Sequence, residues 1–139
     1  MKKIFFILAS IIIIILIYTL NNNNNNYNSI NIPNLNISAS DNTITSKIAY
    51  SDYDLNLVKK FLIKKESTLN VKKDSFVNLR FEDVPDEFSL VLCNPETVIQ
   101  VNNYDFKAPS EPGIYKYRVI FNKYTKGIIE YLFVLNVTD

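Results

Sequence analysis

The stretch EPGIYKYRVIF, residues 111–121, decides the fold class of this chain. Pro112 and Gly113 favour a turn, and the residues after them alternate between the two sides of an extended backbone. One side carries Tyr115, Tyr117, Val119 and Phe121, and the other carries Lys116 and Arg118. A period of two residues is typical of a β-strand with one buried face. The stretch therefore predicts a turn followed by a strand.

A second alternating segment, residues 128–137, aligns Ile129, Tyr131, Phe133, Leu135 and Val137 on one face. Between the two segments lies a basic turn, residues 122–127, whose Gly127 can adopt a positive φ, so we expect an antiparallel hairpin. Leu132 and Val134 are apolar on the reverse face. This favours a central strand, and the alternative is a strand whose outer face meets another protein.

The segments before this hairpin alternate in the same way. Phe76–Phe81 and Phe88–Cys93 each place three apolar side chains on one face, and a turn at residues 84–87 joins them. Thr97–Val101 and Phe106–Glu111 follow, separated by a turn at Asn102 and Asn103. We therefore expect residues 47–139 to form one all-β domain.

The hairpin and the turn before it resemble the last two strands of bacterial immunoglobulin-like β-sandwiches. In that fold a tyrosine corner opens the penultimate strand, so the resemblance implies that Tyr115 is the corner and that Tyr117 takes the position of the second cysteine. The usual disulfide and core Trp are absent from this sequence. The last sixty or so residues are similar to a group of small, uncharacterised, membrane-tethered surface proteins of Gram-positive bacteria. The resemblance implies a fold signature of Pro112, Gly113, Tyr115 and Tyr117, a surface location and no catalytic residues.

The N-terminal segment is the most apolar part of the chain. Ile4 to Leu20 is a run without charge, and it directly follows Lys2 and Lys3. At about 1.5 Å per residue, this run spans roughly 25 Å as a helix, near the short end of what the hydrocarbon core of a bilayer requires. We therefore expect residues 1–20 to form a transmembrane helix. No small-residue cleavage site follows the run, so a retained signal anchor is favoured over a cleaved signal peptide. The positive-inside rule then predicts a single-pass protein with a cytoplasmic N-terminus and an extracellular C-terminal domain.

Residues 21–46 begin with six consecutive asparagines and continue with scattered apolar residues such as Ile30, Leu35 and Ile37. This composition predicts a disordered, flexible linker between the anchor and the domain. An alternative is that the asparagine run promotes self-association through stacked strands.

The composition excludes several classes of chemistry. The chain contains no histidine, which removes Ser-His-Asp and Cys-His catalysis as well as His-ligated zinc. No cofactor motif is present, and the net charge of +1 gives no reason to expect nucleic-acid binding. Glu82, Asp83, Asp86 and Glu87 are close enough in sequence to suggest Ca²⁺, but a solvated turn is favoured. Cys93 is expected to be a buried strand residue, with an intermolecular disulfide as the alternative.

The candidate ligand contacts are tyrosines that lie near predicted loops, namely Tyr50, Tyr53, Tyr104 and Tyr124. Three lysine pairs between residues 59 and 73 offer a basic surface for anionic polymers or headgroups, although a solvated face is favoured. We therefore expect a non-enzymatic module, held at the lipid bilayer, that binds a surface protein or a cell-wall component. The alternative is an accessory or inhibitory subunit that contacts a membrane complex through its Ile-rich helix.

Overall fold

The computed structural model of the chain describes residues 32–53, 59–61, 63 and 65–139. Residues Ile32–Asp139 form one compact unit. The predicted membrane-spanning segment, residues 4–20, and the first part of the predicted linker lie outside the described residues. Within the ranges that are described, no helix has the length and the apolar character needed to cross a bilayer.

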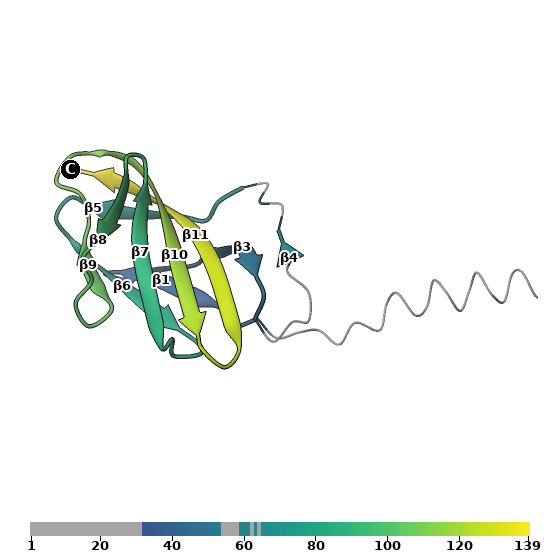
Figure 1. Ribbon diagram of the computed structural model, residues 1–139. Coiled ribbons are helices and arrows are strands. Elements are labelled where there is room, and N and C mark those ends of the chain that lie inside the picture. The colour runs from purple at the N-terminus through teal and green to yellow at the C-terminus, as the bar shows by residue number, and fades with distance from the viewer. Residues whose placement is uncertain (1–31, 54–58, 62, 64) are drawn as a thin grey trace, which may run out of the picture. The chain divides into compact units, whose positions relative to one another are not determined.

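The described residues form eleven β-strands (Figure 1). In chain order they are β1 (Leu35–Ala39), β2 (Asn42–Thr45), β3 (Lys47–Ser51), β4 (Lys59–Lys60), β5 (Thr68–Lys72), β6 (Phe76–Phe81), β7 (Glu87–Cys93), β8 (Glu96–Ile99), β9 (Asp105–Lys107), β10 (Gly113–Lys123) and β11 (Gly127–Thr138).

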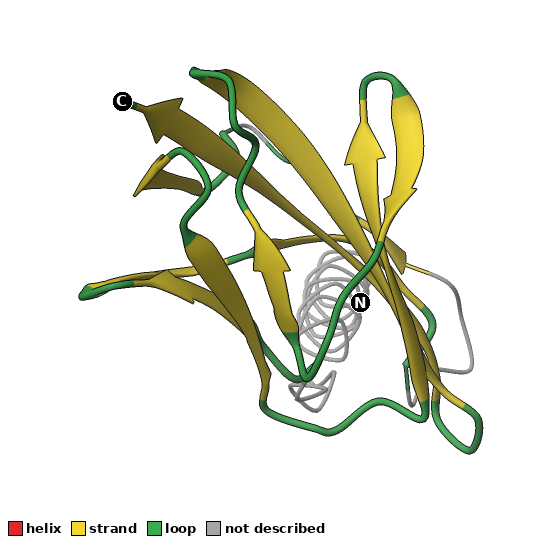
Figure 2. Ribbon diagram, turned by 90° about the vertical axis from the view of Figure 1, so that its left-hand side faces the viewer, coloured by secondary structure: helices red, strands yellow, loops and turns green. Residues whose placement is uncertain are grey.

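The strands form two sheets, which lie in two layers (Figure 2). The smaller sheet has the order β2-β1-β6-β9, and the larger has the order β4-β3-β11-β10-β7-β8, with β5 beside β11. Neighbouring strands are antiparallel except for β5 and β11, which are parallel. The fold is all-β, as predicted, and its layers are consistent with a β-sandwich.

The core lies between the two sheets. The inward side chains of β10 and β11 are large and aromatic, and Tyr117 stacks on its cross-strand partner Phe133 with ring centroids 5.2 Å apart. Phe106 of the smaller sheet approaches Tyr117 to 5.4 Å, which joins the two layers. Full burial of an aromatic side chain contributes about 1.5–3 kcal/mol, so these rings contribute much of the stability of the sandwich.

The hairpin predicted from the sequence is confirmed. β10 and β11 pair along their whole length, from Gly113 opposite Val137 to Lys123 opposite Gly127. The prediction that the second strand is central is also confirmed, because β11 pairs with β10 on one side and with β3 and β5 on the other. This position explains the apolar residue Val134 on its reverse face, which is buried.

The prediction that residues 21–46 form a disordered linker is wrong for the part that the structure describes. Strands β1 and β2 lie within this range, and Leu35 and Ile37 are fully buried in the core. They are buried because β1 pairs with β6 and places every second residue between the sheets. The folded domain therefore begins near Ile32 rather than at residue 47.

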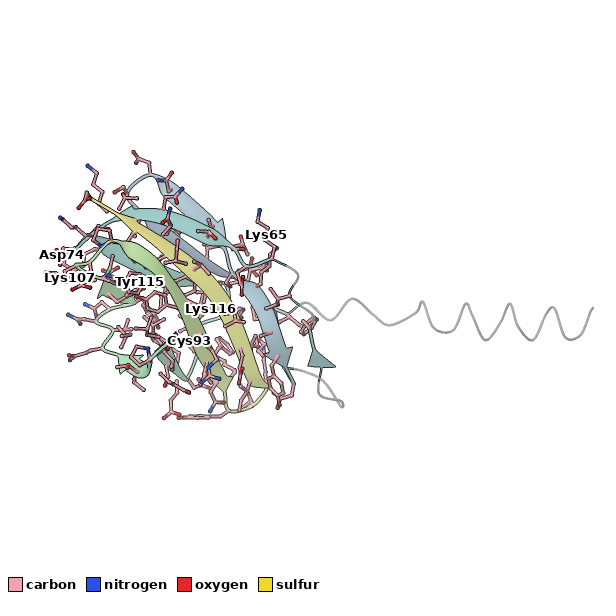
Figure 3. The ribbon with its side chains drawn as sticks, turned by 90° about the horizontal axis from the view of Figure 1, so that it is seen from above. Lys65, Asp74, Cys93, Lys107, Tyr115 and Lys116 are labelled. Atoms are coloured by element: carbon pink, nitrogen blue, oxygen red, sulfur yellow. The ribbon has the colours of Figure 1, made fainter. Side chains whose placement is uncertain are left out.

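The residues of the predicted fold signature lie at the start of β10. The hydroxyl of Tyr115 (labelled in Figure 3) donates a 3.0 Å hydrogen bond to the backbone carbonyl of Glu111, four residues upstream. Two residues further on, Tyr117 is buried, and burial raises the pKa of its hydroxyl to about 12.

Candidate functional site

The pairing of the strands places the start of the domain and four of the loops between strands at one end of the sandwich. Leu35 is paired with Phe81, Asn122 with Glu87, and Ile129 with Ser51, so the chain enters the domain where the β6–β7 and β10–β11 turns lie (Figure 1). We call this region the entry end. It comprises residues 32–34, 51–53, 80–88, 102–105 and 122–128.

An aromatic cluster lies at the side of the entry end. The ring of Tyr104 stacks on Phe88 with centroids 5.4 Å apart and meets the edge of Phe81 at 5.8 Å. Beside them is a cavity of about 240 Å³, lined by Asn78, Leu79, Arg80, Phe81, Val84, Pro85 and Tyr104. We call this cavity the entry pocket. Most of its lining is apolar, while Arg80 and Asn78 bring a charge and an amide to it.

The backbone of Tyr104 is in an unusual conformation. Asn103 and Tyr104 have φ values of 49° and 67°, between Asn102 and Asp105, whose backbones exchange hydrogen bonds of 2.8 and 2.9 Å. Two successive positive φ angles are typical of a tight hairpin turn, where Gly is preferred and a bulky side chain is strained. The Tyr104 carbonyl also accepts a 2.9 Å hydrogen bond from the Leu79 N–H, which fixes the turn against β6.

A polar network lies on the other side of the entry end. The Tyr53 hydroxyl donates to a carboxylate oxygen of Asp83, and Lys126 Nζ lies 2.9 Å from the Tyr53 oxygen and 3.2 Å from Asp83. The hydrogen bond from Tyr53 lowers the pKa of Asp83, whereas burial raises the pKa of Tyr53. Three loops that are far apart in sequence are joined by these contacts.

The turn that carries Val84 is held in place by the β10–β11 hairpin. Lys123 Nζ donates a 2.7 Å hydrogen bond to the Val84 carbonyl and lies 3.6 Å from Asp86. Asp86 accepts a 2.9 Å hydrogen bond from the Tyr124 N–H. The exposed Val84 side chain therefore projects from a fixed backbone.

The carboxylates of Glu82, Asp83 and Asp86 all have partners within the domain, and Lys123 lies near both Asp83 and Asp86, at 3.7 and 3.6 Å. Glu82 accepts hydrogen bonds of 2.7 and 3.1 Å from Asn34, and the backbone N–H of Asn34 lowers the pKa of this carboxyl group. Asp83 and Asp86 bind the groups described above. Among the described residues, no three Asp, Glu or Cys side chains are grouped so that they could hold a metal ion.

The four tyrosines predicted as ligand contacts are not equivalent. Tyr53 is 2% exposed, so its ring belongs to the core, where it meets Phe121 at 5.9 Å. This burial disfavours the predicted role of Tyr53 as a ligand contact. Tyr50 is half-buried, whereas Tyr104 and Tyr124 are 37% and 66% exposed. Sequence reasoning missed Val84 and Pro85, which it assigned only to a turn.

Cys93 lies at the end of β7, away from the entry end, and is half-buried (Figure 3). Burial raises the pKa of its thiol, which outweighs the opposite effect of Arg118 and Lys116 nearby. Of the lysines in the three pairs, Lys65, Lys72 and Lys73 have side chains within the described residues, and all three are exposed.

Comparisons of the chain with protein-family models, with curated proteins and with solved structures found no match. The site is therefore interpreted from its own geometry.

Proposed function

We propose that this chain is a single-pass, membrane-anchored, extracytoplasmic immunoglobulin-like module that binds a protein or a cell-wall component and performs no reaction. The entry pocket is the observation that carries this proposal. Its volume of about 240 Å³ is below the range of roughly 300–1,000 Å³ typical of sites for drug-sized ligands and cofactors. A pocket of this size suits one apolar side chain of a protein partner.

The immunoglobulin-like assignment is supported by strand order and by one hydrogen bond. In that fold one sheet contains strands A, B and E, and the other contains G, F and C. Here β1, β6 and β9 are neighbours in one sheet, and β11, β10 and β7 are neighbours in the other. The bond from Tyr115 to the Glu111 carbonyl is the contact that a tyrosine corner makes. The insertion of β2, β3 and β4 between β1 and β5 is a departure from the simple pattern.

A protein ligand is favoured over a glycan by the lining of the pocket. Leu79, Phe81, Val84 and Pro85 offer apolar surface, and few polar groups are available to bind sugar hydroxyls. Buried aromatic and apolar pockets with a polar rim are typical of the energetic centre of protein interfaces. The strained turn that presents Tyr104 agrees with this interpretation, because strained backbone is often found at binding sites.

Site-specific photocrosslinking in living cells tests this proposal with the full-length chain. A photoreactive phenylalanine analogue is placed at Val84, at the rim of the entry pocket, or at Val98 on β8, which lies outside it. The two positions are 61% and 72% exposed, so they are matched in accessibility. We expect a discrete protein adduct from position 84 alone. Adducts from neither position, or equal adducts from both, would contradict a protein-binding pocket, and an adduct with wall polymer would identify the other ligand class.

A further inference from the structure

The position at which the chain enters the domain limits where a ligand of the entry pocket can lie. Pro33 is buried, and its carbonyl accepts a 2.8 Å hydrogen bond from the Tyr131 hydroxyl. The next residue, Asn34, is bound to Glu82, two residues before Val84. We call residues 21–31, which precede the domain, the tether. The tether therefore joins the domain at the same end of the sandwich that carries the pocket.

The length of the tether gives an upper bound on the distance. Eleven residues, Asn21–Asn31, separate the predicted spanning segment from Ile32. A chain of this length cannot extend beyond about 40 Å in any conformation. The far end of the sandwich is another 35 Å or so away along β10, at about 3.3 Å per residue. With an anchor at residues 4–20, the tether therefore sets a smaller upper limit on the distance to the bilayer for the entry pocket than for the far end of the sandwich.

The charge of the entry end favours a protein over a lipid surface as the ligand of the entry pocket. It carries six carboxylates, from Asp52, Glu82, Asp83, Asp86, Glu87 and Asp105, and three basic side chains, from Arg80, Lys123 and Lys126. Lys59, which is paired with Ser51, is a fourth basic residue, so an acidic surplus of two remains. An acidic surplus is repelled by anionic headgroups and attracts basic residues. The pocket itself has Arg80 as its one charged lining residue, and the acidic residues lie beside it, in the turn at residues 82–87 and at Asp105. The arrangement fits a peptide segment whose apolar side chain enters the pocket and whose Lys or Arg lies against the acidic turn.

We propose that the ligand of the entry pocket is an integral protein of the same membrane, bound through an extracytoplasmic segment close to the bilayer that contains an apolar and a basic residue. This inference rests on the proposed function, because it requires both the membrane anchor and a protein ligand. It adds the location and the chemistry of the partner. Two molecules held in one membrane meet at a high effective concentration, so a small pocket of modest affinity is sufficient.

The first test varies the tether of the full-length chain that carries the crosslinker at Val84. A Gly/Ser insertion between Asn26 and Tyr27 that lengthens the tether about fourfold doubles the thickness of the layer that the domain samples, so it lowers the effective concentration about twofold. We expect the adduct yield to fall by a similar factor, and the partner peptide to come from a protein with a membrane span. The control carries the same insertion after Asp139, where it leaves the tether unchanged.

The outcomes separate this inference from the proposed function. An adduct whose yield is insensitive to tether length leaves a protein-binding pocket in place but overturns a partner in the same membrane. A lipid adduct overturns the inference in favour of the bilayer surface. The absence of any adduct with the unmodified tether overturns the proposed function itself.

The second test addresses the chemistry of the partner. Glu87 is exposed at the entry end, and Glu111 is exposed at the opposite end. We expect Glu87→Gln to lower the adduct yield and to reduce its dependence on salt, because a rim charge mainly affects the association rate. Glu111→Gln is the matched control and should change neither. Equal yields from both variants would contradict a basic partner segment.

Discussion

The hydroxyl of Tyr131 donates a 2.8 Å hydrogen bond to the carbonyl oxygen of Pro33, ninety-eight residues earlier in the chain. Both residues are buried, and burial strongly raises the pKa of the Tyr131 hydroxyl, so it remains a donor at any ordinary pH. The contact fixes the first residues of the domain to the centre of the larger sheet.

Tyr131→Phe is expected to lower the free energy of unfolding by about 1–3 kcal/mol, because it leaves the buried Pro33 carbonyl without its partner. Chemical denaturation of the detergent-solubilised chain measures this. Tyr115→Phe removes a comparable hydrogen bond that is exposed to water, so it should cost less. Equal costs for the two variants would show that the Pro33 carbonyl finds another partner.

Gly127→Ala is expected to destabilise the domain by about 2–4 kcal/mol. Gly127 has a φ of 118°, and an added Cβ would lie 2.5 Å from Asp52 Oδ1 and 2.9 Å from the Asp52 carbonyl oxygen. Gly113→Ala is the control, because its Cβ would meet only the Tyr115 ring, at 3.3 Å, and should cost under about 1 kcal/mol. A Gly127→Ala variant as stable as the Gly113→Ala variant would contradict the close approach of Asp52.

Asp83 is expected to make the domain sensitive to acid. Its pKa is lowered in the folded state, so its contribution to stability is complete above the ordinary pKa of about 4 and is lost as the pH falls through the lower folded value. Asp83→Asn should cost about 1 kcal/mol at neutral pH, given solvent screening, and should flatten the decline of stability below about pH 4. Asp41→Asn, in the exposed turn at the opposite end, is the control. Unchanged acid sensitivity in Asp83→Asn would assign the effect to other carboxyl groups.

Tyr104→Gly is expected to be more stable than Tyr104→Ala by about 1–2 kcal/mol. Both variants lose the stacking on Phe88, but only Gly adopts a φ of 67° without strain. The usual order of these substitutions is the reverse, which makes the comparison decisive. Thermal unfolding of the two variants measures it, and the usual order would mean that the turn relaxes when the ring is removed.

Cys93 is expected to react slowly with iodoacetamide at neutral pH, because burial raises the pKa of its thiol and lowers the fraction of thiolate. The rate should rise at least about tenfold in the denatured chain. Mass spectrometry of the alkylated protein follows both reactions. A native rate equal to the denatured rate would favour the alternative of an exposed thiol that forms intermolecular disulfides.

The sequence was most informative where apolar alternation was long. The eleven-residue pairing of β10 with β11 could be predicted because Tyr117 and Phe133 belong to two runs of period two that a glycine-containing turn joins. Strand β6 was predicted with its observed limits, Phe76–Phe81, for the same reason.

Shorter alternation beside low-complexity sequence was not recognised. Leu35, Ile37 and Ala39 alternate in β1, but the asparagines around them favoured the interpretation as a linker. The parallel pairing of β5 with β11 joins segments that are distant in sequence. The alternation of residues within a strand does not indicate which strand it pairs with. The entry pocket was missed because Val84 and Tyr104 are far apart in sequence. The turns before β7 and β9 place both residues in the lining of the same pocket.

Strand β11, which follows all the other described strands in the chain, is the one around which the larger sheet is built. β11 has β10 on one side and both β3 and β5 on the other, so three strands made earlier have no partner along these edges until it arrives. The larger sheet therefore cannot be completed before residues 127–138 are available to pair. Because β11 pairs with strands that are distant in sequence, we expect the larger sheet to form late in folding.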